Sequence, residues 1–287
     1  MAKKAYIGIN GIAKKIKNSY IGIDGVARKI KKAYIGIGGV ARPCYSFDKK
    51  LVYYGSITNL SNSRSAAGAA SVGEYALFTG SNETVDVYDA SLTRSNTSTT
   101  YGASILNNRG CTVGNYALFA GGNNTSGTYL TLTSAYNDSL IKTVPTKLYT
   151  RRHCHAATST SSKNYAFFGG GYYGSYSAAV DVFDTSLVRT NPSNLYKARA
   201  YLAAASIDKN VLFGGGAGEV FYQDVDVYDE SLTKSMATNL NIVRKDLSAT
   251  SVGEYVLFAG GTQLFSATSE VDGYNKNLTR TNLTPLS

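Results

Sequence analysis

The sequence of 287 residues contains no tryptophan, three cysteines and two histidines. Three cysteines (Cys44, Cys111 and Cys154) do not make a disulfide framework. Both histidines belong to one segment, His153-Cys154-His155, whereas a zinc site needs three or four ligands. We therefore expect no metal and no cofactor, and we interpret Cys111 and Cys154 as small, buried residues at equivalent positions.

Long apolar stretches are also missing. No run of about 18 apolar residues occurs, so no membrane span is expected. The apolar run after the first lysines is short and recurs downstream, which argues against a signal peptide. The chain is therefore expected to be made in the cytoplasm without a secretion signal.

Acidic residues are scarce at the N-terminus. The first 42 residues hold ten basic residues and one acid, Asp24, whereas the whole chain has 29 basic and 19 acidic residues. Almost all of the net charge of +10 therefore belongs to this segment. Lysines can protect exposed strands from aggregation, or the segment can attract an acidic protein. Nucleic acid is not favoured, because no recognised nucleic-acid motif accompanies the charge.

A block of the type GEYALFTG recurs about every 45 residues. Its aligned positions are 41, 49, 46 and 44 residues apart: Tyr75, Tyr116, Tyr165, Val211 and Tyr255. A repeat of this length, made of short strands, indicates a repeat architecture rather than a series of unrelated domains.

Each block belongs to a longer unit of four expected strands. An arginine leads the unit, the aromatic block follows, and then come an alternating segment such as VDVYD (85–89) and a polar stretch. Alternation with β-branched and aromatic residues indicates strands. Repeated four-stranded units are typical of an all-β β-propeller. Five units favour five blades, with an extra strand from a half-copy within residues 47–60 helping to close the ring. Six blades are the alternative, in which residues 34–39 imitate a second strand.

A shorter repeat occupies the N-terminus, with Tyr6, Tyr20 and Tyr34 spaced 14 residues apart. Each copy predicts a hairpin in which a Tyr-Ile-Gly-Ile strand, a two-residue turn and a basic return strand follow one another. Ile9 should face Ile12, and Ile7 should face Lys14. Because an isolated hairpin is marginal in water, we expect this arm (1–43) to pack against something, ahead of the propeller (44–287).

The long unit resembles Kelch-type β-propellers. The resemblance lies in an aromatic strand closed by a double glycine, as at Gly169-Gly170, and in a second strand that ends in Tyr-Asp, as at Tyr228-Asp229. Kelch units usually carry a tryptophan after that strand. Here leucines stand in its place and are expected to take its packing role: Leu92, Leu140, Leu187, Leu232 and Leu278.

The hairpin tandem followed by a Kelch-like region resembles structural tail proteins of tailed phages and of phage-tail-like bacteriocins of Gram-positive bacteria. The resemblance implies a virion or tail-like particle as the location, with the arm docking to other tail proteins. The arm residues expected to dock are Tyr6, Tyr20, Tyr34, Lys14, Lys15, Arg28 and Lys29. Copies of the chain could also associate with one another in the particle.

The loops between the second and third strands are the candidate binding residues, because variable loops on a rigid scaffold commonly carry function. They are rich in aromatic residues, which can stack on sugars: Tyr172, Tyr173, Tyr176, Phe221, Tyr222 and Phe265. The leading arginines should share this end and could pair with an anion, or instead bond backbone carbonyls: Arg64, Arg109, Arg152, Arg199 and Arg244.

No catalytic constellation is recognised. The recurrent acids of the third strand are interpreted as hydrogen-bond acceptors, and neither a nucleophile elbow nor a phosphate loop is present. The expected function is therefore a non-enzymatic tail or baseplate component whose loops bind a host-surface glycan or protein. The alternatives are a scaffolding protein that binds no receptor and, less favoured, a propeller-based enzyme.

Overall fold

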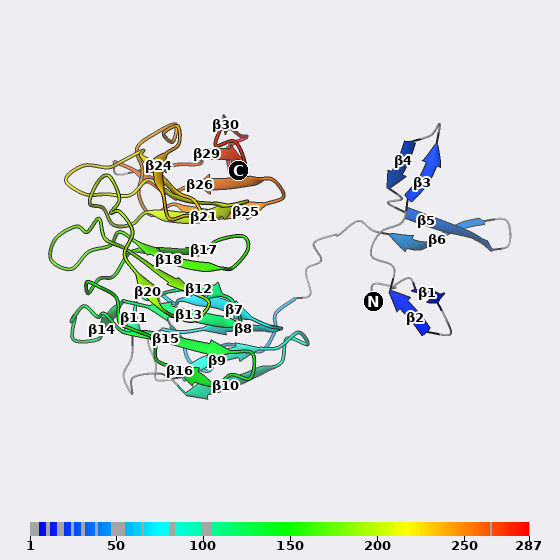
Figure 1. The fold of residues 1–287 in the computed structure, drawn as a ribbon, viewed down its shortest axis with the longest axis horizontal. Helices are drawn as coiled ribbons and strands as arrows, with labels where there is room; N and C mark the ends of the chain where they lie inside the picture. The colour runs from blue at the N-terminus through cyan, green and yellow to red at the C-terminus, as the bar shows by residue number, and fades with distance from the viewer. Residues whose placement is uncertain are drawn as a thin grey trace. The chain divides into compact units, whose positions relative to one another are not determined.

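The computed structural model describes the strands between residues 6 and 46, and residues 55–286 except 65, 81–83, 99–104 and 265. The chain divides into two compact units, Met1–Ser56 and Ile57–Ser287. The described residues form small antiparallel sheets and no helix, which confirms the all-β prediction (Figure 1).

The first unit consists of three separate hairpins. They are formed by β1 (Tyr6–Ile9) with β2 (Ile12–Lys15), β3 (Tyr20–Ile23) with β4 (Val26–Lys29), and β5 (Lys32–Ile37) with β6 (Val40–Ser46). Ile9 pairs with Ile12 and Ile7 with Lys14, as the repeat predicts. The two-residue turns expected between the strands lie outside the described residues.

The arm residues expected to dock are placed by this pairing. Tyr6 pairs with Lys15, Tyr20 with Lys29, and Ile21 with Arg28. The third hairpin is longer and its register shifts between Ala33 and Tyr34, so that Tyr34 pairs with Pro43.

The second unit contains five four-stranded antiparallel sheets, which follow one another along the chain. The first sheet is formed by β7 (Ala69–Val72), β8 (Tyr75–Phe78), β9 (Thr84–Tyr88) and β10 (Arg94–Ser98). The second is formed by β12 (Arg109–Val113), β13 (Tyr116–Ala120), β15 (Thr133–Asn137) and β16 (Lys142–Thr143). The third is formed by β17 (Ala156–Ser159), β18 (Tyr165–Gly169), β19 (Val180–Asp184) and β20 (Arg189–Thr190).

The last two sheets have the same order. The fourth is formed by β21 (Ala203–Ile207), β22 (Asn210–Gly214), β23 (Val225–Tyr228) and β24 (Lys234–Met236). The fifth is formed by β25 (Ser248–Val252), β26 (Tyr255–Ala259), β29 (Val271–Asn275) and β30 (Arg280–Asn282). Two short pairs lie in loops, β11 (Ile105–Leu106) with β14 (Asn123–Asn124) and β27 (Thr262–Gln263) with β28 (Ser266–Ala267).

Pairing corrects one position of the long repeat. Val211 pairs with Tyr228, as Ala166 pairs with Phe183, so Asn210 rather than Val211 is the counterpart of Tyr165. The tyrosine position is therefore spaced 45 residues on either side of Asn210. Asn210 then lies four residues before Gly214, just as Tyr165 lies four residues before Gly169.

The core lies between successive sheets. Four clusters of buried apolar residues join the first sheet to the second, the second to the third, the third to the fourth, and the fourth to the fifth. Alternation along each strand produces this arrangement, since Phe168 packs toward the second sheet and Phe167 toward the fourth. The second, third and fourth sheets have an apolar cluster on each face and are therefore more buried than the first and fifth sheets.

The leucines that follow the third strands pack mostly against the apolar clusters. Leu187 belongs to the cluster between the second and third sheets, and Leu140, Leu232 and Leu278 pack against the corresponding clusters. Leu92 of the first sheet is exposed instead. The expected packing role is therefore found for four of the five leucines, each against the sheet that precedes its own.

The first strands of the five sheets surround a hollow of about 710 Å³. Neighbouring first strands lie side by side in the order β7, β12, β17, β21 and β25, and small residues from all five line the hollow. Among the described residues, no apolar cluster joins the fifth sheet back to the first. The five sheets thus share one hollow, and the two end sheets each leave one face without such a cluster.

Candidate binding face

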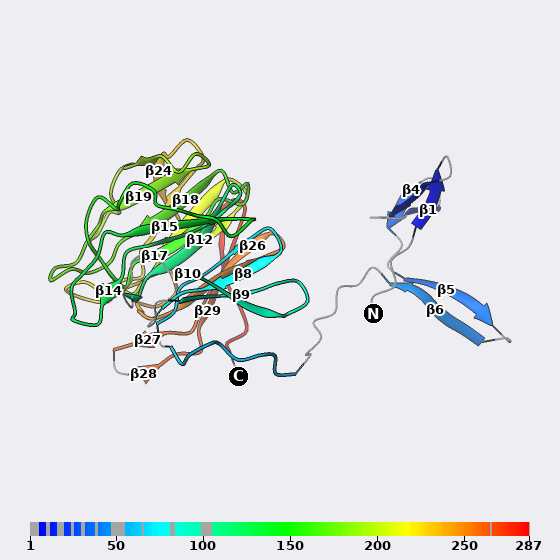
Figure 2. The same cartoon turned by 90° about the horizontal axis from the view of Figure 1, so that it is seen from below.

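The connections between second and third strands lie at one end of the sheets. Antiparallel pairing brings the start of the first strand, the end of the second and the start of the third to this end, as Ala156 opposite Gly169 and Gly169 opposite Val180 illustrate. This end is on the left of the second unit in Figures 1 and 2, where β14 is labelled. We call it the loop end.

Four of the five leading arginines are buried in ion pairs within their own sheets. Arg152 Nη2 lies 2.5 Å from Asp181 Oδ2, and Arg199 Nη2 lies 2.6 Å from Asp226 Oδ2. Arg244 pairs with Asp272 at 2.8 Å, and Arg64 pairs with Asp86. Neither partner exposes any side-chain surface in these four pairs.

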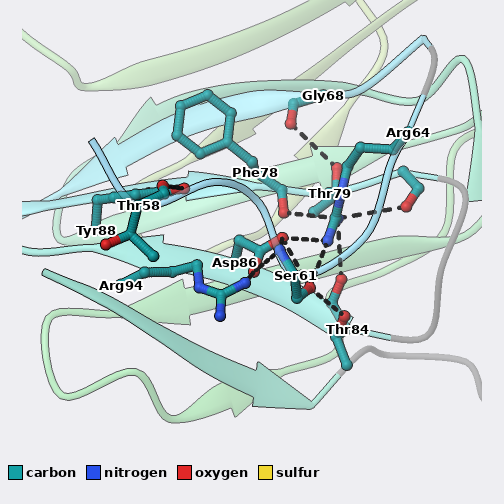
Figure 3. Close-up of polar contacts among 11 residues, drawn as sticks. Thr58, Ser61, Arg64, Gly68, Phe78, Thr79, Thr84, Asp86, Tyr88 and Arg94 are labelled. Carbon is teal, nitrogen blue, oxygen red and sulfur yellow. Dashed lines mark hydrogen bonds and ion pairs between the residues drawn. The ribbon is translucent and has the colours of Figure 1, made fainter. Parts of the chain in front are cut away.

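Each pair also ties the sheet to the segment that leads into it. Figure 3 shows the first sheet, where Arg64 donates to the carbonyl of Phe78 and Asp86 accepts from the backbone N–H of Ser61. The same pattern recurs in the third sheet, with the carbonyl of Phe168 and the N–H of Tyr149. The recurrent acids are therefore hydrogen-bond acceptors, as predicted.

This burial corrects the assignment of the arginines to a ligand. Arg64, Arg152, Arg199 and Arg244 cannot meet a ligand at the loop end without breaking a buried pair. Removing one partner of such a pair leaves an uncompensated buried charge and costs about 3–5 kcal/mol. Their role is structural, within a sheet, which was the alternative that the sequence left open.

The second sheet lacks this pair altogether. Gly110 pairs with Phe119, as Ala157 pairs with Phe168, so the counterpart of Arg152 is Ile105 and not Arg109. The counterpart of Asp181 is Ser134, which faces Phe119 as Asp181 faces Phe168. Arginine and aspartate are thus replaced together, and neither charge is left alone in the core.

The same register separates the two cysteines. Cys111 pairs with Leu118 inside a strand, and the counterpart of Cys154 is Asn107. The Cys154 position has a left-handed backbone in every sheet, with φ between 50° and 60° at the five equivalent residues: Ala66, Asn107, Cys154, Tyr201 and Asp246. The prediction that Cys111 and Cys154 are equivalent is therefore wrong, although both are buried and unpaired.

The left-handed residues connect neighbouring sheets at the loop end. The N–H of Asn107 donates to the carbonyl of Ala66, the N–H of Tyr201 to that of Cys154, and the N–H of Asp246 to that of Tyr201. These bonds join the first sheet to the second, the third to the fourth and the fourth to the fifth, and the N–H of Gly122, which donates to the carbonyl of Arg152, joins the second to the third. Together they form a hydrogen-bonded base below the loops.

An aromatic cluster stands on this base. Tyr129 stacks on His153 with ring centroids 4.9 Å apart and an angle of 8° between the planes. Tyr172 meets both rings edge-on, at 6.2 Å and 5.9 Å, and Tyr176 packs on Tyr172 at 5.3 Å. All four side chains are partly exposed. We call Tyr129, His153, Tyr172 and Tyr176 the aromatic cluster.

Lysines accompany the aromatic residues of the next loop. The ammonium of Lys245 lies 5.4 Å from the ring centre of Phe221 and 5.2 Å from that of Tyr201. Lys197 lies 5.0 Å from the ring centre of Tyr222 and 3.0 Å from Asp224. The predicted loop residues therefore form two groups, one around Tyr172 and Tyr176 and one around Phe221 and Tyr222.

The two other predicted loop residues are Tyr173 and Phe265. Tyr173 lies in the same loop and is partly exposed, and Phe265 lies outside the described residues. His153, Tyr201 and Lys245 were not predicted to take part. A sequence signal for them existed, because each lies one or two residues after a leading arginine and therefore at the loop end.

The electrostatics disfavour the charged form of His153, the histidine of the aromatic cluster. Partial burial and then the positive charge of Arg109 lower the pKa of His153. Burial lowers the pKa of His155 well below its usual value, with Arg152 and Arg109 adding to the effect. Burial raises the pKa of the Cys154 thiol. At neutral pH the histidines are uncharged and Cys154 is a thiol, which is a poor nucleophile.

The chemistry of the face is that of stacking and hydrogen bonding. Within the described part of the chain, no three or more His, Cys, Asp or Glu side chains gather as a metal site would require. The described residues also contain no helix that is long and apolar enough to cross a membrane. Neither a protein-family model nor a curated protein matches the chain. The assignment of the candidate site therefore rests on the geometry of its residues.

Proposed function

We propose that the second unit is a five-bladed Kelch-like β-propeller whose loop end binds a saccharide on a host surface. Five four-stranded sheets in chain order and a hollow lined by all five first strands support the propeller. The four buried Arg–Asp pairs support it further, because each repeats the same bonds in the same place.

The aromatic cluster carries the proposal of saccharide binding. Its rings are partly exposed, neutral and held by backbone bridges from His153 to Tyr172 and from Tyr172 to Tyr176. Rigid aromatic side chains offer a large apolar face together with a hydroxyl, at a small entropic cost. A sugar ring presents the matching combination of C–H faces and hydroxyls. A host-surface protein is the second candidate ligand.

We further propose that the chain is a non-enzymatic component of a phage tail or a tail-like particle, and that the basic hairpin arm docks it to other tail proteins. The arm is a compact unit of its own, and short hairpins gain stability only by packing on a partner. The excess of basic residues in the arm suits an acidic partner surface.

Binding to Gram-positive cells and to their purified wall polysaccharides tests the ligand. A triple variant Tyr129→Ala, Tyr172→Ala, Tyr176→Ala should lose binding by about a hundredfold, since each ring contributes about 1 kcal/mol. The matched control removes three tyrosines that are exposed elsewhere, Tyr149, Tyr196 and Tyr255. Equal binding by the triple variant and the wild type would reject the aromatic cluster as the site.

Deletion of residues 1–43 tests the role of the arm. Both cell binding and incorporation into particles are measured for the truncated chain. The truncated chain should still bind cells but fail to enter particles. A scaffolding protein without a receptor would behave differently, because the wild type would then bind no cells while the deletion still prevented assembly.

A further inference from the structure

Arg109 occupies an unusual place at the loop end. It begins β12, opposite Ala120, and the following residues Gly110, Cys111 and Thr112 line the hollow. By register, small residues take the equivalent position in the other four sheets: Gly68, Ala156, Ala203 and Ser248. Ala156 and Ala203 belong to apolar clusters against the next sheet, so by register the long cationic side chain of Arg109 faces the third sheet at the loop end.

The charge of Arg109 is not matched by an acid. The other four leading arginines each pair with an aspartate, whereas Arg109 donates to the backbone carbonyl of Asn108 at 3.1 Å. No ion pair of Arg109 is found among residues 55–286 that the structure describes. A partly buried and unpaired cation is costly unless an anion reaches it.

The surroundings of Arg109 are those of a ligand site. Arg109 pairs with Ala120, and Gly122 two residues further on donates its N–H to the carbonyl of Arg152, the residue before His153. Arg109 is thus close in the fold to the segment that carries His153, and its positive charge lowers the pKa of His153. Tyr201 is the left-handed residue next to Cys154 in the adjacent sheet, and its side chain is partly exposed. A planar donor group on the second sheet, the aromatic cluster between the second and third sheets, and a phenol on the fourth sheet thus lie in succession along the loop end.

We propose that Arg109 binds the anionic group of an acidic saccharide whose ring packs on the aromatic cluster. The guanidinium can hold a carboxylate or a phosphate with two parallel hydrogen bonds. This inference names the ligand class of the proposed site and rests on that function. Its two sources, a uronic acid and a sugar phosphate, differ in the anion and not in the mode of binding.

Three probes test the inference on the full chain by calorimetry: a galacturonic-acid oligosaccharide, an oligomer of hexoses joined through phosphate and a neutral oligosaccharide of the same length. We expect the wild type to prefer at least one acidic probe by about tenfold. The probe that binds identifies carboxylate or phosphate as the anion. Arg109→Gln should remove the preference, and Arg109→Lys should retain part of it.

Arg151→Gln is the matched control, because Arg151 is an exposed arginine in the segment that carries His153. It should leave the preference unchanged. The melting temperature of each variant checks the fold, and Arg109→Gln should not lower it, since the substitution removes an unpaired charge.

Two results would overturn the inference: a wild type without preference for an acidic probe, or an Arg109→Gln variant that keeps the preference. Other results would overturn the proposed function itself, and they differ from those that overturn the role of Arg109. If the neutral probe binds equally well and the tyrosine triple variant loses it, the saccharide site stands and only the anion partner is wrong. If the triple variant keeps cell binding, the site itself is wrong.

Discussion

At the residue scale, the buried Arg–Asp pair is the constant part of each sheet. Arg199, for example, donates to Asp226 and to the carbonyl of Phe213, while Asp226 also accepts from the N–H of Tyr196. One pair thus joins the leading segment, the second strand and the third strand. The second sheet has Ile105 and Ser134 in these places, which shows that the fold tolerates losing both charges together.

Breaking one pair should therefore cost more than replacing it. Asp226→Ser leaves Arg199 charged and buried, and should lower the free energy of unfolding by about 3–5 kcal/mol. The double variant Arg199→Ile, Asp226→Ser copies the second sheet and should lose clearly less than the single variant. Urea unfolding measures both, with Glu219→Ser in an exposed loop as the control.

A single variant that loses less than about 1 kcal/mol, which is typical of an exposed ion pair, would contradict this account. So would a double variant that loses as much as the sum of the two single substitutions, because partners in contact are not expected to behave independently.

At the element scale, the alternation of residues predicted the strands, but it did not predict which residues of different units occupy equivalent positions. The pattern predicted four strands per unit and the hairpin pairing of Ile7 with Lys14. It misplaced Arg109, because position 105 is an isoleucine and the next arginine in the chain was taken instead. The change from VDVYD to TSAYND was the available signal, since the partner aspartate had also disappeared.

The candidate site was predictable only in part for a similar reason. Alternating residues identify a strand, and antiparallel order places the loops at one end. Which side chains meet across loops of different length depends on tertiary packing. The stacking of Tyr129 on His153 joins residues that belong to different sheets, and no local pattern encodes it.

The turn between the third and fourth strands offers a matched test of packing against backbone strain. Leu92 and Leu187 occupy the same left-handed position, with φ of 62° and 63°. Leu92 is 43% exposed and Leu187 is 8% exposed. Glycine adopts this backbone without steric cost, so Leu92→Gly should leave the free energy of unfolding unchanged or raise it by about 1 kcal/mol.

Leu187→Gly also removes the steric cost of the left-handed backbone, but it loses buried apolar contacts between the second and third sheets. A buried leucine truncation costs about 2–5 kcal/mol, so a net loss of about 1–4 kcal/mol is expected. Thermal and urea unfolding of the two variants measure the difference. Equal effects would mean that the leucines do not take the packing role of the missing tryptophan.

At the scale of the second unit, the four apolar clusters distinguish inner sheets from end sheets. Phe168 and Phe213 are fully buried, whereas their counterpart Phe78 in the first sheet is only partly buried. In the fifth sheet, Leu257 is partly buried although its counterparts Phe167 and Leu212 are fully buried. The faces that would meet in a closed propeller are thus the less buried ones.

Amide hydrogen exchange should follow this gradient. Strands β18 and β22, with apolar clusters on both sides, should be protected close to the global free energy of unfolding, whereas β8 and β26 should exchange through local opening. The reason is that opening an end sheet breaks one cluster instead of two. Exchange followed by mass spectrometry compares the four strands within one molecule, so no variant is needed. Equal protection of β8, β18, β22 and β26 would reject the gradient and would mean that the first and fifth sheets pack against each other as firmly as the inner sheets do.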